Sequence, residues 1–180
     1  MTGGITKKLK NRFAKDLIGF AYVMCGKELT EYQEKVLLDD SRRIIVCSGR
    51  QVGKSTVTVV KALWRAWCFD KQDIMIVGPS ERQAEIIYNK IYEMILANPV
   101  LYNDTVRFTI RKTQFRNGSV IRCSPGGHTG DFIRGFACDM IIVDEAQNVN
   151  DEVFVSIMPG RTERGKVIVD TSGIAKIGEL

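Results

Sequence analysis

The 180-residue chain lacks several features that would assign it to particular classes of protein. No apolar run reaches the length of a membrane span, and the basic N-terminus is not followed by the apolar core of a secretory signal. The five cysteines form no CxxC pair and His128 is the one histidine, which argues against a zinc site. We therefore expect no membrane partner, and cysteines that are buried, reduced thiols of a cytosolic protein.

Charge and apolar content set further bounds. A hydrophobic content of 44% is enough for one core, and the length predicts one domain with at most a small appended piece. The net charge of +5 favours a polyanionic partner. Basic residues gather in segments 7–15 and 107–122, and each of these segments could equally be a solvated face.

The segment 44–56 carries the strongest local signal, and it reads IIVCSGRQVGKST. Its apolar start predicts a buried strand, and the VTVVKALWRAW that follows has apolar residues at helical spacing. A strand, a glycine-containing loop that ends in Gly-Lys-Ser, and a helix form the context of a phosphate-binding loop. One position departs from the usual pattern, because Ser48 stands where the first glycine is expected and Gly49 follows it.

The residue types of this loop suit the phosphates of a nucleotide. Gly53 lets the backbone approach an anion, and backbone N–H groups at the start of the helix point at the phosphates. Lys54 would supply a positive charge, and the Ser55 hydroxyl would bind Mg²⁺. The predicted nucleotide-binding residues of the loop are Ser48, Gly49, Arg50, Gln51, Val52, Gly53, Lys54, Ser55 and Thr56.

Two helices are predicted ahead of the loop. Residues 5–24 carry apolar residues on one helical face, and Gly26 is expected to end that helix. Thr30 is expected to cap a short second helix, with Gln33 completing a capping box. The Gln33 amide could equally read the edge of an adenine, and the spacing leaves both roles open.

Strands and helices alternate after the loop. A helix to about Phe69, a strand at 74–77 and a helix from Ser80 to Asn98 predict a parallel sheet covered on both faces. Residues 106–124, with Asn-Gly at 117–118, predict antiparallel strands at the sheet edge or on one face. The glycine-rich segment 125–130 is either a surface connection or a phosphate contact.

A third core strand, 137–144, is predicted to end in two carboxylates. Burying Asp144 and Glu145 is costly unless they meet cations, which a Mg²⁺-nucleotide would supply. Asp144 would then bind the metal through water, and Glu145 would polarise the attacking water. A helix or a short turn at 153–157 and a fourth strand at 166–170 follow. Thr171 and Ser172 beyond it either contact the γ-phosphate or form a simple turn.

These elements predict the fold class: an α/β P-loop NTPase of the RecA-like (ASCE) type. Its mainly parallel sheet would be flanked by helices, with an antiparallel hairpin near 105–124. Residues 1–28 would form an N-terminal helical arm and residues 29–180 the P-loop domain.

Several motifs together resemble one family. They are Tyr32-Gln33, Arg50-Gln51-x-Gly53-Lys54-Ser55, Ile133-Arg134-Gly135, Met140 to Glu145 and Asp170-Thr171-Ser172. In order and type they are similar to those of the ATPase domain of the large terminase subunits of tailed bacteriophages, the motors that package viral DNA. The arginines of the second and third motifs make the resemblance specific, and it covers roughly residues 29–173.

The resemblance implies roles for individual residues. Glu145 would be the catalytic base, and Arg50 would reach the γ-phosphate or pair with a carboxylate when the site is empty. Arg134 would be a finger inserted into the neighbouring subunit's site, although an ion pair with Asp131 or Asp139 is an equally physical role. Thr171 and Ser172 would couple hydrolysis to movement.

The resemblance also implies cofactors and partners. ATP and Mg²⁺ would be the cofactors, and double-stranded DNA would be translocated by a homo-oligomeric ring. The portal protein and the small terminase subunit would be partners, in the host cell cytoplasm and transiently at the procapsid portal. The family's C-terminal nuclease domain is absent from these residues, so we expect no nuclease activity.

Other functions remain open at this stage. A helicase-type nucleic-acid-dependent ATPase shares the glutamine, the phosphate loop and Asp-Glu, but would normally add motifs in a second motor domain. A P-loop module that binds nucleotide without turnover has no need of Glu145 as a base or of Arg134 as a finger. A small-molecule kinase would need a substrate-binding lid, for which the sequence offers no candidate.

Overall fold

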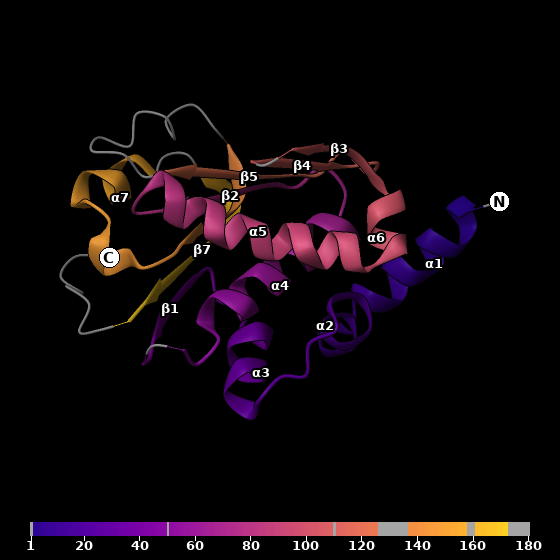
Figure 1. The fold of residues 1–180 in the computed structure, drawn as a ribbon, viewed down its shortest axis with the longest axis horizontal. Coiled ribbons are helices and arrows are strands. Elements are labelled where there is room, and N and C mark those ends of the chain that lie inside the picture. The colour runs from indigo at the N-terminus through magenta and orange to yellow at the C-terminus, as the bar shows by residue number, and fades with distance from the viewer. Residues whose placement is uncertain (1, 50, 110, 126–136, 158–160, 173–180) are drawn as a thin grey trace.

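The computed structural model describes residues 2–49, 51–109, 111–125, 137–157 and 161–172. These residues are organised around a seven-stranded sheet with the order β1-β7-β6-β2-β5-β4-β3 (Figure 1). Neighbouring strands from β1 to β5 in this order are parallel, and β4 and β3 extend the sheet in antiparallel fashion. The strands are β1 (Arg43–Cys47), β2 (Asp73–Gly78), β3 (Thr105–Thr109), β4 (Lys112–Phe115), β5 (Val120–Pro125), β6 (Cys138–Val143) and β7 (Arg161–Thr171). The predicted α/β fold with a mainly parallel sheet is confirmed.

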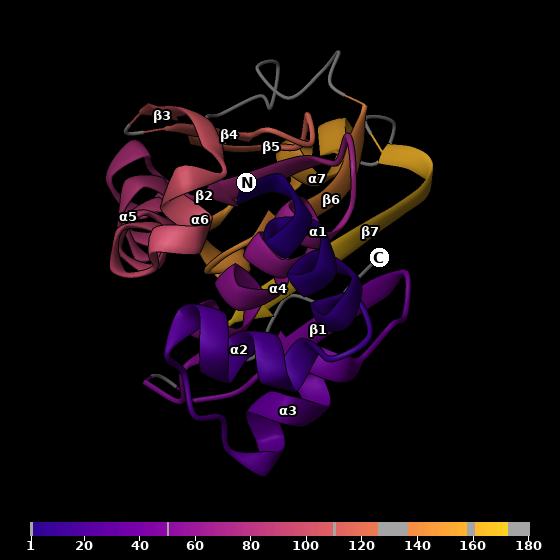
Figure 2. The same cartoon turned by 90° about the vertical axis from the view of Figure 1, so that its right-hand side faces the viewer.

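Helices cover the sheet unequally. The helices are α1 (Thr2–Phe13), α2 (Leu17–Cys25), α3 (Glu31–Leu38), α4 (Lys54–Cys68), α5 (Glu81–Ala97), α6 (Pro99–Asn103), the 3₁₀ turn η1 (Ala146–Asn148) and α7 (Asp151–Ile157). Helices α4 and α5 lie against one face, with α2 and α3 beyond α4 (Figure 2). Among the described ranges, none of these helices is long and apolar enough to cross a membrane.

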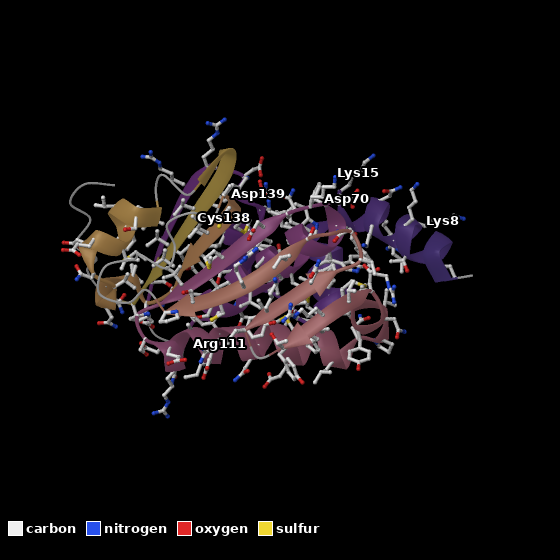
Figure 3. All side chains as sticks on the ribbon, turned by 90° about the horizontal axis from the view of Figure 1, so that it is seen from above. Lys8, Lys15, Asp70, Arg111, Cys138 and Asp139 are labelled. Carbon is white, nitrogen blue, oxygen red and sulfur yellow. The ribbon has the colours of Figure 1, made fainter. Side chains whose placement is uncertain are left out.

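Each face of the sheet carries its own apolar cluster. The larger cluster lies under α4 and α5 and includes Trp67, Leu63, Ile76 and Tyr88. The smaller one joins β2, β6 and β7 to η1 and α7 on the opposite face, which Figure 3 views. Burial on both faces accounts for the continuous apolar runs of β2 and β6. Coverage on both faces is therefore confirmed for these central strands.

The predicted single helix at 5–24 is wrong, because the chain forms two helices there. Asp16 begins α2 by accepting a hydrogen bond from the Gly19 N–H at 2.8 Å, so its side chain competes with a continuous helix. The break lets Phe13 and Phe20 meet edge to face, with ring centroids 5.9 Å apart, and both are fully buried. Gly26 ends α2 in the left-handed conformation, as the sequence indicates.

The turn at Asn117-Gly118 and the antiparallel strands predicted around it are confirmed, since β4 pairs in antiparallel fashion with both β3 and β5 at one end of the sheet. The turn joins β4 to β5, and β5 pairs in parallel with β2 inside the sheet. The Asn117 amide also donates to the carbonyls of Ala66 at 2.9 Å and Phe69 at 2.8 Å, at the end of α4. Alternating residues predict a strand but do not identify every partner, so the sequence indicated the hairpin and did not indicate the parallel pairing of β5 with β2.

Strand β1 differs from the fully buried strand that its composition predicts. It is an edge strand of the described sheet, so Ile44 and Val46 point into the core while Ile45 is 41% exposed. Cys47 is exposed for the same reason, which contradicts the expectation of buried cysteines. Cys25, Cys123 and Cys138 are buried, and burial raises the pKa of each thiol to about 12.

Candidate active site at the carboxyl ends of the strands

The phosphate loop connects β1 to α4, and two observations require a glycine at position 53. Gly53 has a φ of 84°, and a side chain there would approach the Gln33 amide nitrogen to 2.3 Å. The Val57 N–H donates to the Gly53 carbonyl at 3.2 Å, which begins the helical hydrogen bonding of α4, and Thr56 lies in this first turn. The loop therefore presents the start of a helix at its end, as the sequence predicts.

Lys54 is buried and its ammonium group is held inside the loop. It donates to the carbonyls of Ser48 at 3.0 Å and Gly49 at 2.8 Å, and to the Ser172 hydroxyl at 2.9 Å. These acceptors come from both sides of the site, so the charge lies between the loop and the end of β7. Phosphate oxygens are acceptors of the same kind, and this position suits their binding.

Ser55 and Asp144 meet across the site. The Ser55 hydroxyl donates to the Asp144 carboxylate at 2.8 Å, and Asp144 is buried at the end of β6. Hydroxyl and carboxylate oxygens are ligands that Mg²⁺ accepts. Within the described ranges no three His, Cys, Asp or Glu side chains form a metal cluster. The pair therefore fits a Mg²⁺ ion that takes its remaining ligands from phosphates and water, as Mg²⁺ commonly does.

Asp170 is a third carboxyl group at this edge; it begins the motif Asp170-Thr171-Ser172, but the sequence indicates no separate role for its carboxyl group. It is fully buried at the end of β7, beside β6. Burial, and then the neighbouring charge of Asp144, raise the pKa of Asp170 to about 8. Its Oδ1 accepts the Glu145 N–H at 3.3 Å. A carboxylate that directly follows the apolar run Val-Ile-Val was the signal in the sequence.

Glu145 has an unusual backbone conformation and a fully engaged carboxylate. Its φ is 50°, in the left-handed region that a non-glycine residue seldom adopts. The carboxylate accepts the Ser172 hydroxyl at 3.0 Å and the side-chain amide of Gln147. The Gln147 carbonyl oxygen in turn accepts the Thr171 hydroxyl, and the Ser172 N–H at 3.3 Å.

Gln147 thus joins three residues that the sequence placed in the site separately: Glu145, Thr171 and Ser172. No motif in the sequence identifies Gln147. The only signal available was an amide side chain shortly after the acidic pair. Thr171 and Ser172 form more than a simple turn, because the Thr171 side chain contacts Gln147 and the Ser172 side chain contacts Glu145.

The first turn of α3 contacts the phosphate loop at two points. The Gln33 amide accepts the Thr30 N–H at 3.0 Å and donates to the Val52 carbonyl at 3.0 Å. The predicted capping box is therefore confirmed. The Tyr32 hydroxyl donates to the Ser48 hydroxyl at 3.0 Å. Adenine recognition by Gln33 stays a prediction.

A cavity of about 550 Å³ opens beside the loop, of the size that small-molecule sites have. Its lining residues are Gln51, Gly53, Lys54, Ser55, Gln83, Lys90, Glu145, Asn148 and Ser172. Most of these were predicted from the sequence. Gln83, Lys90 and Asn148 were not, because the sequence shows no motif that connects α5 or η1 with the loop.

Some predicted residues cannot be compared with the structure. Arg50, Arg134 and the segment 126–136, with its glycine-rich run, lie outside the described residues. Asp139, a possible partner of Arg134, accepts the Asp73 N–H at 2.9 Å. The predicted roles of both arginines therefore stay predictions.

Comparison with known proteins adds a family match. The model of a family described as terminase large subunit, T4likevirus-type, N-terminal, matches residues 45–172. No curated protein sequence matches the chain. The match covers the phosphate loop, the acidic pair and the segment up to Ser172.

Solved structures share the fold at low sequence identity. The large terminase ATPase domain of Thermus phage P74-26 is 21% identical with a TM-score of 0.72, over 83% of this chain and 67% of that chain. A large terminase from a thermophilic bacteriophage, in complex with ADP, is 14% identical with a TM-score of 0.59, over 80% of this chain and 39% of that one. S. cerevisiae dbp5 bound to nup159, gle1, ip6 and adp is 18% identical with a TM-score of 0.62, over 89% and 46% of the two chains. At these identities the likeness concerns the fold.

Proposed function

The chain belongs to the T4likevirus-type terminase large subunits, whose N-terminal domain it matches, and on this basis we propose that it hydrolyses ATP to drive double-stranded DNA into a viral procapsid. The observation that carries the proposal is the meeting of Lys54, Ser55, Asp144 and Glu145 at one edge of the sheet. A phosphate-binding lysine, a metal-binding pair and a base are the groups that phosphoryl transfer to water requires.

Each group has a distinct task in this proposal. Lys54 and the N–H groups at the start of α4 bind the phosphates of ATP. Ser55 and Asp144 hold Mg²⁺, which neutralises charge on the phosphates when bound. Glu145 orients the attacking water and accepts its proton. Arg50 adds a positive charge at the γ-phosphate from the same chain, and Gln33 reads the adenine.

The coupling of hydrolysis to movement is proposed to run through Gln147. Its amide contacts the Glu145 carboxylate, and its carbonyl oxygen contacts Thr171 and Ser172. Ser172 also accepts a hydrogen bond from Lys54. A change of phosphate contacts at Lys54 therefore reaches the end of β7 and the base together, and we propose that this network transmits the loss of the γ-phosphate.

The chain spans 39% of the length of a large terminase whose structure contains ADP. We propose a homo-oligomeric ring in which Arg134 enters the neighbouring subunit's site. Portal protein and small terminase subunit would be its partners, in the host cytoplasm and at the procapsid portal. DNA would be held through its phosphates, so its affinity should fall steeply with salt.

Steady-state ATP hydrolysis, measured against protein concentration with and without duplex DNA, tests the proposal. The rate per subunit should climb with concentration, because sites are completed between subunits. Arg134→Ala should then lower it by about 10³-fold, the lower end of the range for an arginine finger. Arg82→Ala is the matched control, since Arg82 is an exposed arginine that does not line the cavity.

Other outcomes would redirect the assignment. A rate per subunit that is high and independent of concentration would place the active site in one chain and contradict the finger. Bound nucleotide without hydrolysis at any concentration would support a binding module. ATP-dependent separation of duplex strands would favour the helicase-type ATPase instead.

A further inference from the structure

Helix α5 lines one side of the cavity, although no sequence motif connects this helix with nucleotide binding. Gln83 and Lys90 of α5 share the cavity with Lys54 and Glu145. We propose that Lys90 is a second in-chain cation for the nucleotide, which binds the terminal phosphate of a nucleoside triphosphate, with Gln83 as a neighbouring hydrogen-bonding group. This inference rests on the proposed binding of ATP in the same cavity.

The course of α5 explains how Lys90 reaches the site. The helix begins directly after β2, at the strand-end edge that also holds the acidic pair, and runs back along the sheet above α4 (Figure 1). Its apolar side buries Ala84, Ile87 and Ile91 in the core. Gln83 and Lys90 lie about two turns apart on one side of the helix. Helical side chains lean towards the start of their helix, so the Lys90 stem is directed back towards the strand ends.

The lining of the cavity identifies which end of a nucleotide would lie beside α5. Lys54, Ser55 and Glu145 belong to the lining, and they are the groups for phosphates, metal and water. Tyr32 and Gln33, where the adenine is predicted, do not belong to it. Lys90 therefore shares the phosphate end of the site rather than the base end.

The charge of Lys90 is available for a ligand. No described residue forms a hydrogen bond or an ion pair with its ammonium group, and the side chain is only partly exposed. Arg111, beside the same helix, is instead paired with Glu81 and Glu85. A triphosphate keeps a net negative charge with Mg²⁺ bound, and an ammonium group forms charge-assisted hydrogen bonds with its oxygens.

This placement predicts discrimination between nucleotides. The phosphates nearer the ribose are expected at the start of α4 and Lys54 between the last two phosphates, whereas the terminal phosphate lies towards Glu145. A contact from Lys90 to that last phosphate is present with a triphosphate and absent with a diphosphate. Lys90 should therefore contribute to the affinity for ATP and contribute little to the affinity for ADP.

The test is equilibrium binding of ATPγS and of ADP, each with Mg²⁺ and without DNA, to the wild type, Lys90→Ala, Lys90→Arg and Arg82→Ala. We expect Lys90→Ala to weaken ATPγS binding by about 10-fold or more, as for one hydrogen bond to a charged group, and ADP binding by less than about 2-fold. Lys90→Arg should recover most of the ATPγS affinity. Arg82→Ala, on the same helix but outside the cavity lining, should bind both like the wild type.

Each contrary result has one meaning. Equal effects of Lys90→Ala on both nucleotides, or no effect on either, would overturn the inference while leaving ATP binding intact. Unchanged ATPγS binding with weakened binding of duplex DNA would overturn it too, because the ammonium would then serve DNA phosphates. A wild type that binds neither nucleotide would refute the proposed function and the inference with it. Thermal melting of all variants confirms that each is folded.

Discussion

Two regions of helix α4 each bury a lysine, and they use it differently. Lys54 lies in the first turn and Lys61 about two turns further along, and their relative exposures are 6% and 3%. Both ammonium groups donate to backbone carbonyls. Burial and hydrogen bonding are therefore alike in the two regions, and the difference lies in which groups accept.

Lys61 binds the end of another helix. Its acceptors are the carbonyls of Val36 at 3.4 Å, Leu37 at 2.9 Å and Asp39, where α3 ends. The last carbonyls of a helix have no partner within it, so Lys61 replaces a cap and joins α4 to α3. A protein-internal role of this kind leaves no place for a ligand.

The acceptors of Lys54 do not belong to the end of a helix. The Ser48 and Gly49 carbonyls belong to a loop that lies against the cavity, and Ser172 is the third acceptor. Phosphate oxygens can take the place of these groups without exposing a helix end. The role of a buried lysine therefore follows from the groups that accept its hydrogen bonds, because both lysines are buried.

The largest expected effect separates the two lysines by activity. Lys54→Met should lower the rate of ATP hydrolysis by about 10²–10³-fold, the range for loss of one preorganised electrostatic contact. The melting temperature should change little, because the carbonyls released belong to Ser48 and Gly49, neither of which is buried. Hydrolysis and thermal melting are measured on the same preparation, with Lys61→Met beside it. A Lys54→Met protein that hydrolyses ATP like the wild type would show that Lys54, like Lys61, has no role in hydrolysis.

The second effect is on stability. Lys61→Met should lower the free energy of unfolding by about 1–3 kcal/mol, the cost of leaving buried carbonyls without partners. Hydrolysis per folded molecule should stay near the wild-type value, because Lys61 is not part of the cavity lining. Urea denaturation measures the first quantity and a rate assay at low temperature the second. Equal stability of the two proteins would show that the α3 end does not depend on Lys61.

The smallest effect is a dependence on pH. Burial, and then the nearby charge of Lys166, lower the pKa of Lys61 from 10.5 to about 8. Between these values the unfolded chain holds a proton that the folded chain has lost, so stability contributed at this site rises with pH across that window. Below about pH 8 both states are protonated and the contribution is constant.

The measurement for this effect is the difference in unfolding free energy between the wild type and Lys61→Met at several pH values from 7 to 10. The difference should grow in favour of the wild type above about pH 8. Taking the difference removes the titration of other groups, which both proteins share. Parallel curves would mean that Lys61 titrates in the folded protein as it does in water.

Elements that depend on neighbouring residues could be predicted from the sequence. The strand, loop and helix at 43–68, the cap at Thr30 and the turn at Asn117-Gly118 each depend on a few neighbouring residues, and all three are confirmed. The break at Asp16 is equally local, but the apolar face of residues 5–24 concealed it. A capping side chain inside a regular apolar pattern is therefore a signal that periodicity alone misses.

Contacts between distant segments could not be predicted from residue type and short spacing. Three features depend on residues that are far apart in the chain. They are the place of β1 at the sheet edge, the parallel pairing of β5 with β2, and the contact of Gln147 with Thr171. Alternation and apolar content describe a strand and not its neighbours. For the same reason no motif identified Lys90, whose position depends on how α5 crosses the site.

The sequence by itself determined the strand, loop and helix around Gly53, the alternation of strands and helices, and the place of the acidic pair at the end of a strand, because these depend on residue type and short spacing. The tertiary structure alone decided which side chains meet at the strand ends. Parallel strands bring Asp144 and Asp170 to one edge, and the folded chain brings Gln147 against Thr171 there. It also decided that Lys54 faces a cavity while Lys61 faces a helix end. The physical reason is that desolvation and hydrogen-bond partners are properties of the packed chain, and residue type alone does not specify them.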